Sequence, residues 1–159
     1  MTEETKGFVS TAAVKDTSIK DKVLANLYTE YEKIKKSYSE KDFAVDINNP
    51  ALLARALYLS RGIASKYYDL QAELLKYIAK AELRYRLFKL EAMDTMSVEK
   101  SKEYPLNSDF ENTKNLHYAK AILSMVEVQL TQMEGWNATF SRLQTVLLDS
   151  SKQGLINIE

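Results

Sequence analysis

Residues 50–94 read PALLARALYLSRGIASKYYDLQAELLKYIAKAELRYRLFKLEAMD and decide the fold. The stretch holds one glycine, Gly62, has no proline after Pro50, and consists mostly of residues that favour helices. Apolar residues recur in it at alternating spacings of four and three, the repeat of a coiled-coil seam. The seam positions, one of them basic, are Ile63, Tyr67, Leu70, Leu74, Tyr77, Ala81, Arg84 and Phe88.

The length of this helix bears on assembly. A helix of 45 residues is about 67 Å long at 1.5 Å per residue, about twice the diameter of a small domain. A chain of 159 residues buries so long a helix more easily with the help of a second copy, so we expect self-association. With Gly 4 and Pro 2 the chain also lacks the turns of a sheet protein. We therefore predict an all-α, homo-oligomeric fold of long antiparallel helices with coiled-coil-like seams.

Two more helices flank the long one. Ser18 with Asp21 suits a helix start, and Asn49 before Pro50 marks a stop followed by a new start. The period lapses between 95 and 107, which predicts an irregular connection. The prediction is one helical domain over 17–152, with helices at about 18–41, 50–94 and 109–150, between an N-terminal tail (1–16) and a C-terminal tail (153–159).

The last helix carries a second seam. Its apolar positions are again spaced by three and four, and Asn137 and Gln144 fill two of them. Polar residues in a seam tend to fix the register of the helices. Taking the two seams as surfaces that join copies, we predict an oligomer interface made of Leu70, Leu74, Tyr77, Leu130, Met133 and Phe140.

Several function classes find no support in the residues. Cysteine is absent and His117 is the only histidine, so the usual zinc sites and a histidine-based triad lack their parts. No phosphate-binding glycine loop or calcium loop occurs. We expect no enzyme, no catalytic residue, no metal and no cofactor. Since the chain holds neither a signal peptide nor a long apolar run, we also expect a cytoplasmic protein with no membrane contact.

One basic cluster stands out from the neutral total of 22 Lys/Arg and 22 Asp/Glu. Basic side chains interleaved with aromatic rings suit single-stranded nucleic acid, because cations follow the phosphates while rings stack on bases. A simpler interpretation stays open, in which Tyr77 and Phe88 belong to the core and the lysines to an ordinary solvated face. The candidate DNA-binding residues are Lys76, Lys80, Arg84, Arg86 and Lys89, with Tyr77, Tyr85 and Phe88 among them.

Two short motifs give this cluster a context. Leu83-Arg84-Tyr85-Arg86-Leu87 resembles the Leu-basic-x-Arg-Leu motif of the UvsY family, the recombination mediators of T-even-type bacteriophages. Lys41-Asp42-Phe43-Ala44-Val45-Asp46 is similar to the segment that precedes the long helix in that family. The order of helices is also similar, over roughly residues 30–150.

The resemblance implies a non-enzymatic protein that forms a homo-oligomeric ring and binds single-stranded DNA. Such a protein helps a RecA-like recombinase to displace a single-strand-binding protein and load onto DNA in an infected bacterium. Arg84 and Arg86 match the basic pair of the family motif, whereas Lys76, Lys80 and Lys89 are added from their spacing alone.

Two other functions remain open at this point. The first is a helical phage structural or assembly adaptor, in which the seams make oligomers and DNA has no role. The second is a helical module that sequesters another protein through the acidic 103–150 region, where six Asp/Glu face three Lys/Arg.

Overall fold

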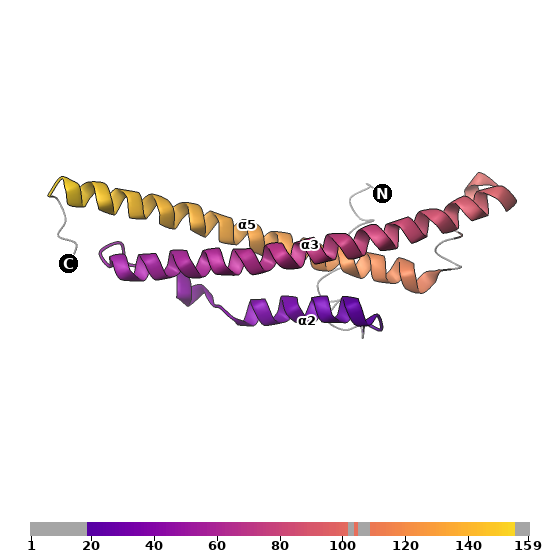
Figure 1. Cartoon of the computed structure of the whole chain (residues 1–159), viewed down its shortest axis with the longest axis horizontal. Coiled ribbons are helices and arrows are strands. Elements are labelled where there is room, and N and C mark those ends of the chain that lie inside the picture. The colour runs from indigo at the N-terminus through magenta and orange to yellow at the C-terminus, as the bar shows by residue number, and fades with distance from the viewer. Residues whose placement is uncertain (1–18, 102–103, 105–108, 155–159) are drawn as a thin grey trace, which may run out of the picture. The chain divides into compact units, whose positions relative to one another are not determined.

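The computed structural model describes residues 19–101, 104 and 109–154. Over this part the chain is all-α and forms no strand, with the elements α2 (Lys22–Lys36), η2 (Glu40–Phe43), α3 (Pro50–Thr95) and α5 (Phe110–Lys152) in order (Figure 1). The all-α class is confirmed. The tail 1–16, residues 155–159 of the other tail, and part of the predicted connection 95–107 lie outside the described residues.

The first helix is shorter than the predicted range 18–41. It starts after Asp21, whose Oδ1 accepts a hydrogen bond from the Leu24 amide at 2.9 Å, as an N-cap does. It ends where the Ser37 amide and hydroxyl both donate to the Ile34 carbonyl, at 3.1 and 2.6 Å. The chain then turns into η2, the 3₁₀ turn, because the Ser39 amide donates to Asp42 Oδ2 at 2.8 Å.

Both long helices begin at recognisable caps, and α5 also ends at one. Asn49 Oδ1 accepts from the Leu52 amide at 3.2 Å and starts the 46-residue α3. Asp109 precedes the 43-residue α5, and its carbonyl accepts from the Thr113 amide at 3.1 Å. Gly154 follows α5 with φ +72°, a left-handed conformation that glycine adopts without strain at a helix end.

The contacts divide the chain into two compact units. Unit 1 holds residues 1–30 and 70–126, and unit 2 holds 31–69 and 127–159. The helices α2, α3 and α5 each contribute one part to either unit.

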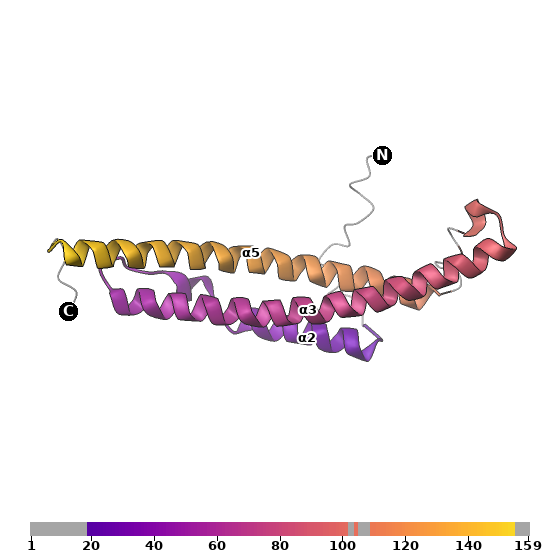
Figure 2. The ribbon, with the colours of Figure 1, turned by 45° about the horizontal axis from the view of Figure 1, so that its top comes forward.

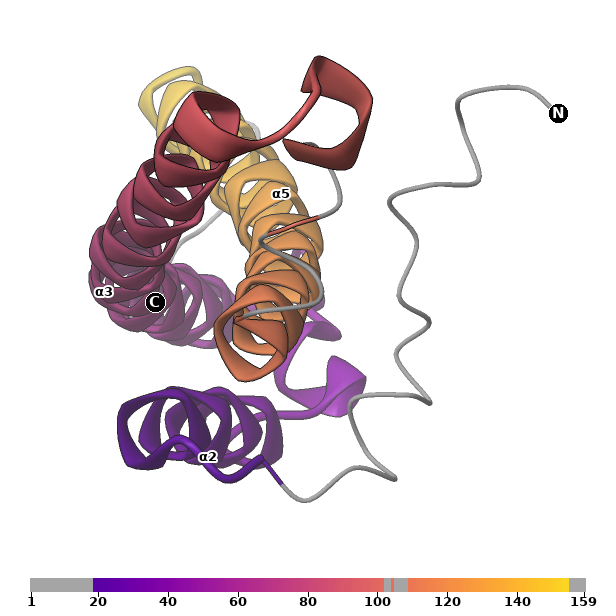
Figure 3. The same ribbon diagram turned by 90° about the vertical axis from the view of Figure 1, so that its right-hand side faces the viewer.

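In unit 1, α3 and α5 run antiparallel. The Ala81 carbonyl accepts a hydrogen bond from Asn112 Nδ2 at 3.1 Å. Arg84 comes later in α3 but pairs with Asp109, which comes before Asn112, so the two helices run in opposite directions. Figure 3, which looks along the helices, shows α2, α3 and α5 as separate rods. The core of the unit is apolar and includes Leu24, Leu74, Ile78, Ala81, Leu116, Ala119, Ile122 and Val126.

In unit 2, α5 again lies beside α3 in opposite direction, as Figure 2 shows. The Ser60 hydroxyl, fully buried, donates to the Asn137 side chain, so this polar seam residue has its partner inside the chain. The Tyr38 hydroxyl meets the Tyr67 hydroxyl at 2.7 Å and donates to Gln129 Oε1 at 2.8 Å. Such bonds tolerate little sliding of the helices, because a shifted helix would leave buried polar atoms without partners.

The face of α3 that the spacing singled out is mostly buried. Five of the eight seam residues are at most 6% exposed, namely Ile63, Tyr67, Leu70, Leu74 and Ala81. Tyr77 and Phe88 are half-buried, and Arg84 is exposed. The side of α3 that carries the apolar repeat is therefore largely buried by other helices of the same chain, within each of the two units.

We expect Leu74→Ala to lower the free energy of unfolding by about 2–5 kcal/mol, because this fully buried side chain leaves a cavity. The neighbouring Leu75 is 49% exposed, so Leu75→Ala serves as the matched control and should cost no more than about 0.5 kcal/mol. Urea unfolding followed by circular dichroism measures both. Equal reductions in the two variants would mean that the buried face of α3 is assigned wrongly.

Candidate nucleic-acid interface

A basic groove of about 340 Å³ opens in unit 1 where α2, α3 and α5 meet. Three of the predicted DNA-binding residues line it, Lys76, Lys80 and Arg84. The start of α2 contributes Asp21, Val23 and Leu27, α5 contributes Asn112, and α3 adds Glu73, Tyr77 and Ala81. The groove is the place where the structure brings the predicted basic residues together.

Helix geometry explains why only three of the five predicted residues share the groove. Residues spaced by four lie on one side of a helix, so Lys76, Lys80 and Arg84 point the same way. Arg86 is two positions after Arg84 and therefore points about 200° away at 100° per residue. Arg86 is exposed and Lys89 half-buried, and neither lines the groove. The two arginines of the motif thus face different directions.

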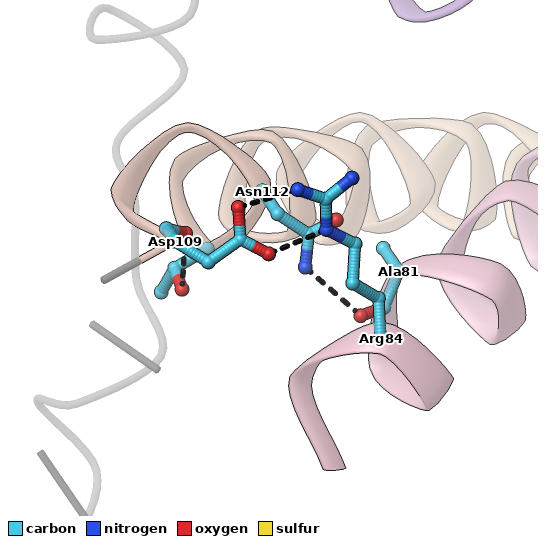
Figure 4. Close-up of polar contacts among 5 residues, drawn as sticks. Ala81, Arg84, Asp109 and Asn112 are labelled. Carbon is cyan, nitrogen blue, oxygen red and sulfur yellow. Dashed lines mark hydrogen bonds and ion pairs between the residues drawn. The ribbon is translucent and has the colours of Figure 1, made fainter. Parts of the chain in front are cut away.

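Arg84 is held by an acidic partner that the sequence did not indicate. Its Nε lies 2.5 Å from Asp109 Oδ2 and its Nη2 lies 2.8 Å from Asp109 Oδ1, a bidentate pair shown in Figure 4. Hydrogen bonding to this carboxylate, together with its charge, raises the pKa of Arg84. Asp109 is 8% exposed, and beside the pair Asn112 ties α5 to the Ala81 carbonyl of α3.

The pairing leaves Arg84 partly available. Its side chain is 59% exposed, and the pair engages two of the five N–H donors of the guanidinium. Its guanidinium carbon also lies 5.7 Å from the centre of the Phe88 ring. A phosphate can therefore reach the outer edge of Arg84, although the side chain is already fixed in position.

The two lysines differ in their surroundings. Lys76 Nζ lies 2.8 Å from Glu73 Oε1, a pair on the helix surface that contributes little stability. Lys80 is exposed and has no acidic partner among the described residues. Lys80 is therefore the groove cation best placed to meet a new anion.

The aromatic residues of the cluster are less available than the cations. Tyr77 and Phe88 are half-buried, and the Phe88 ring packs near Tyr104 at 6.3 Å between centroids. Burial, with a smaller effect of nearby Asp21, raises the pKa of Tyr77 to about 12, so its hydroxyl stays protonated at neutral pH. These rings line or support the groove more than they offer faces to bases.

The residues of the predicted oligomer interface lie mostly inside the single chain. Leu70, Leu74, Leu130, Met133 and Phe140 are each at most 5% exposed within the single chain, and Tyr77 is half-buried. A side chain already covered by its own chain has little apolar surface to offer to a second copy. The spacing rule found the right buried face but could not tell which chain covers it.

Sequence reasoning also missed Asp109 and Asn112. Both lie at the start of α5, 25 and 31 positions from the α3 atoms that they contact. No local spacing signals a contact over that distance.

Two further properties concern only the described part of the chain. No helix there is long and apolar enough to cross a membrane. No group of three or more acidic or histidine side chains there is placed to hold a metal ion.

Comparisons of the chain with protein-family models, with curated proteins and with solved structures find no match.

We expect Arg84→Ala to lower the free energy of unfolding by about 1–2 kcal/mol, because it strips the nearly buried Asp109 carboxylate of its partner. Arg86→Ala is the control two positions away on an exposed side chain, and it should change stability by less than about 0.5 kcal/mol. Urea unfolding again provides the measurement. If both variants unfold like the wild type, the Arg84–Asp109 pair contributes nothing to unit 1.

Proposed function

We propose that this protein is a non-enzymatic recombination mediator of the UvsY type. In this proposal it binds single-stranded DNA as a homo-oligomeric ring and helps a RecA-like recombinase to replace a single-strand-binding protein. The observation that carries the proposal is the groove of unit 1, because Lys76, Lys80 and Arg84 line one hollow beside the motif Leu83–Leu87.

The charges of the groove suit a weak, repeated contact with phosphates. Three cations line it, but Asp21 and Glu73 line it too and Asp109 pairs with Arg84, so one copy attracts a polyanion only feebly. Assembly multiplies this attraction, since linked weak contacts gain through their high effective concentration. DNA held across several copies is also arranged in advance for the recombinase, which lowers the cost of starting its filament.

A ring needs a surface that joins copies, and α3 offers one in unit 1. Leu83, Leu87 and Leu90 are 60%, 52% and 58% exposed. Their spacings of four and three place them on one side of the helix, away from the buried Ala81 and Ala92. We call these three residues the leucine stripe and propose that it contacts a second copy, because burying a leucine fully contributes about 1.5–3 kcal/mol.

The DNA contact is tested by fluorescence anisotropy with a labelled single-stranded oligonucleotide. We expect Lys80→Ala/Arg86→Ala to weaken binding for every base sequence. The slope of log K against log salt should become shallower by about 0.7 for each phosphate that the variant no longer neutralises. Neither residue has an acidic partner among the described residues, so folding should be unaffected.

Lys36→Ala is the control for that experiment, because Lys36 is an exposed lysine at the end of α2 in unit 2, outside the groove. The proposed DNA contact is ruled out if the wild type does not bind the oligonucleotide. It is also ruled out if the binding changes neither with salt nor in Lys80→Ala/Arg86→Ala. A recombinase-loading assay on DNA coated with single-strand-binding protein then tests the mediator role itself.

The leucine stripe also favours the second candidate function, a helical phage structural or assembly adaptor without a DNA role. An exposed apolar surface of this kind marks a protein contact whether or not DNA binds. The two functions differ in one respect. The adaptor forms the same oligomer with or without DNA, and its groove is an ordinary solvated surface.

We expect Leu87→Gln to lower the mass measured by light scattering, because a polar side chain in the leucine stripe weakens the contact between copies without breaking the helix. Leu75→Gln is the matched control, an exposed leucine of α3 outside the stripe. An unchanged mass for Leu87→Gln would show that the copies, if they associate, use another surface. Adding the oligonucleotide to each sample separates the mediator from the adaptor.

A further inference from the structure

The first part of α3, which belongs to unit 2, has a basic surface of its own. No acidic residue occurs between Asp46 and Asp69, whereas Arg55, Arg61 and Lys66 fall within that stretch. All three basic side chains are exposed. This surface is separate from the groove, because the groove is lined only by residues of unit 1.

Tyr58 occupies the middle of this surface. It is 83% exposed, the most exposed of the large apolar and aromatic side chains in the described chain. The buried residues around it on α3 lie about 100–160° away at 100° per residue, and they are Ala56, Leu57, Ser60, Ile63 and Ala64. The Tyr58 side chain makes no hydrogen bond or ring contact with any described residue, so no contact in its own chain holds the ring in place.

Two arginines flank the ring. Arg55 and Arg61 lie three positions before and after Tyr58, so they project about 60° to either side of it and about 9 Å apart along the helix. Arg61 Nη2 reaches the Ser141 hydroxyl of α5 at 3.5 Å, a long contact that leaves its other donors unused. Arg55 forms no ion pair among the described residues.

The surface around Tyr58 is open. Ala54, Gly62 and Ser65 share its side of the helix and are exposed, and all three are small. A Cβ added at Gly62 would meet no atom within 4 Å. A planar group can therefore approach the Tyr58 ring without meeting a bulky neighbour.

At one end the basic surface borders η2, which carries Glu40, Lys41 and Asp42. Arg55 lines a hollow of about 150 Å³ together with Lys41. Asp42, the acidic residue of this hollow, already accepts the Ser39 amide. The hollow therefore holds two cations, Arg55 and Lys41, and one carboxylate.

We propose that Tyr58 is a stacking platform for an unpaired base of single-stranded nucleic acid, and that Arg55 and Arg61 contact the phosphates on either side of that base. The inference rests on the proposed function, and it adds to the groove of unit 1 a second contact with the same ligand. Stacking on an aromatic ring accepts every base, which suits a protein that must bind any single strand.

The test uses the full-length protein and a fluorescein-labelled single-stranded oligonucleotide that carries 5-iodouracil. Tyr58→Ala should weaken binding about tenfold, a typical effect of removing one stacked base. Tyr58→Phe should bind within about twofold of the wild type, because it keeps the ring face. Arg55→Ala/Arg61→Ala should weaken binding and lower the salt slope, whereas Lys36→Ala, exposed in the same unit, should not.

Photocrosslinking locates the contact independently of affinity. Irradiation of the wild-type complex should attach the oligonucleotide to the tryptic peptide Ala56–Arg61, which contains Tyr58. Crosslinks confined to other peptides, together with wild-type affinity of Tyr58→Ala, would overturn the inference. A lower oligomer mass in Tyr58→Ala would overturn it too, since the surface would then be a contact between copies.

The same titration separates the two proposals. If Tyr58→Ala weakens binding while Lys80→Ala, a substitution within the groove, does not, the stacking platform stands and the groove assignment fails. If only Lys80→Ala weakens binding, the groove stands and the platform fails. If the wild type binds no single strand, both fail.

Discussion

Each long helix has one apolar side that must be buried away from water, and this requirement determines the packing in both units. In α3 the buried residues recur at the helix repeat, from Leu53 and Ile63 in unit 2 to Leu74 and Ala81 in unit 1. Packing against α2 and α5 covers most of that side, although Arg84 on it stays exposed. Whatever α3 contacts outside its own chain must therefore meet its remaining surface, and there the arginines, lysines, Tyr58 and the leucine stripe lie.

The Arg84–Asp109 pair links packing and the proposed binding. The pair joins α3 to the start of α5 in unit 1 and fixes a guanidinium at the edge of the groove. A side chain positioned in advance loses less conformational entropy when it binds a phosphate. The same carboxylate offsets much of the charge of Arg84, so Lys80 has the larger unopposed charge in the groove. Stability and the proposed attraction for DNA thus make opposite demands on Arg84.

Much of the fold was open to prediction because it depends on local rules. The spacing of Ile63, Leu74 and Ala81 pointed to one side of α3, and that side is buried. The start of α3 at Asn49-Pro50 could also be predicted from the sequence, since a helix cap involves only neighbouring residues. Leu130 and Met133, which the periodicity suggested as contacts between copies, are buried within the single chain. Periodicity indicates that one side of a helix is buried, but it does not indicate which chain buries it. The exposed Tyr58 was overlooked because a seam pattern directs attention to the buried side.

By itself the amino-acid sequence determined the helical class, the start of α3 and the side of that helix that avoids water, since each follows from contacts within a few turns. Only the tertiary structure decided which cations share a hollow, which carboxylate Arg84 meets, and which leucines and tyrosines stay in solvent. Those outcomes depend on how α2, α3 and α5 pack within each unit. The residues in contact are 25 or more positions apart in the chain, so no local sequence pattern indicates their contact.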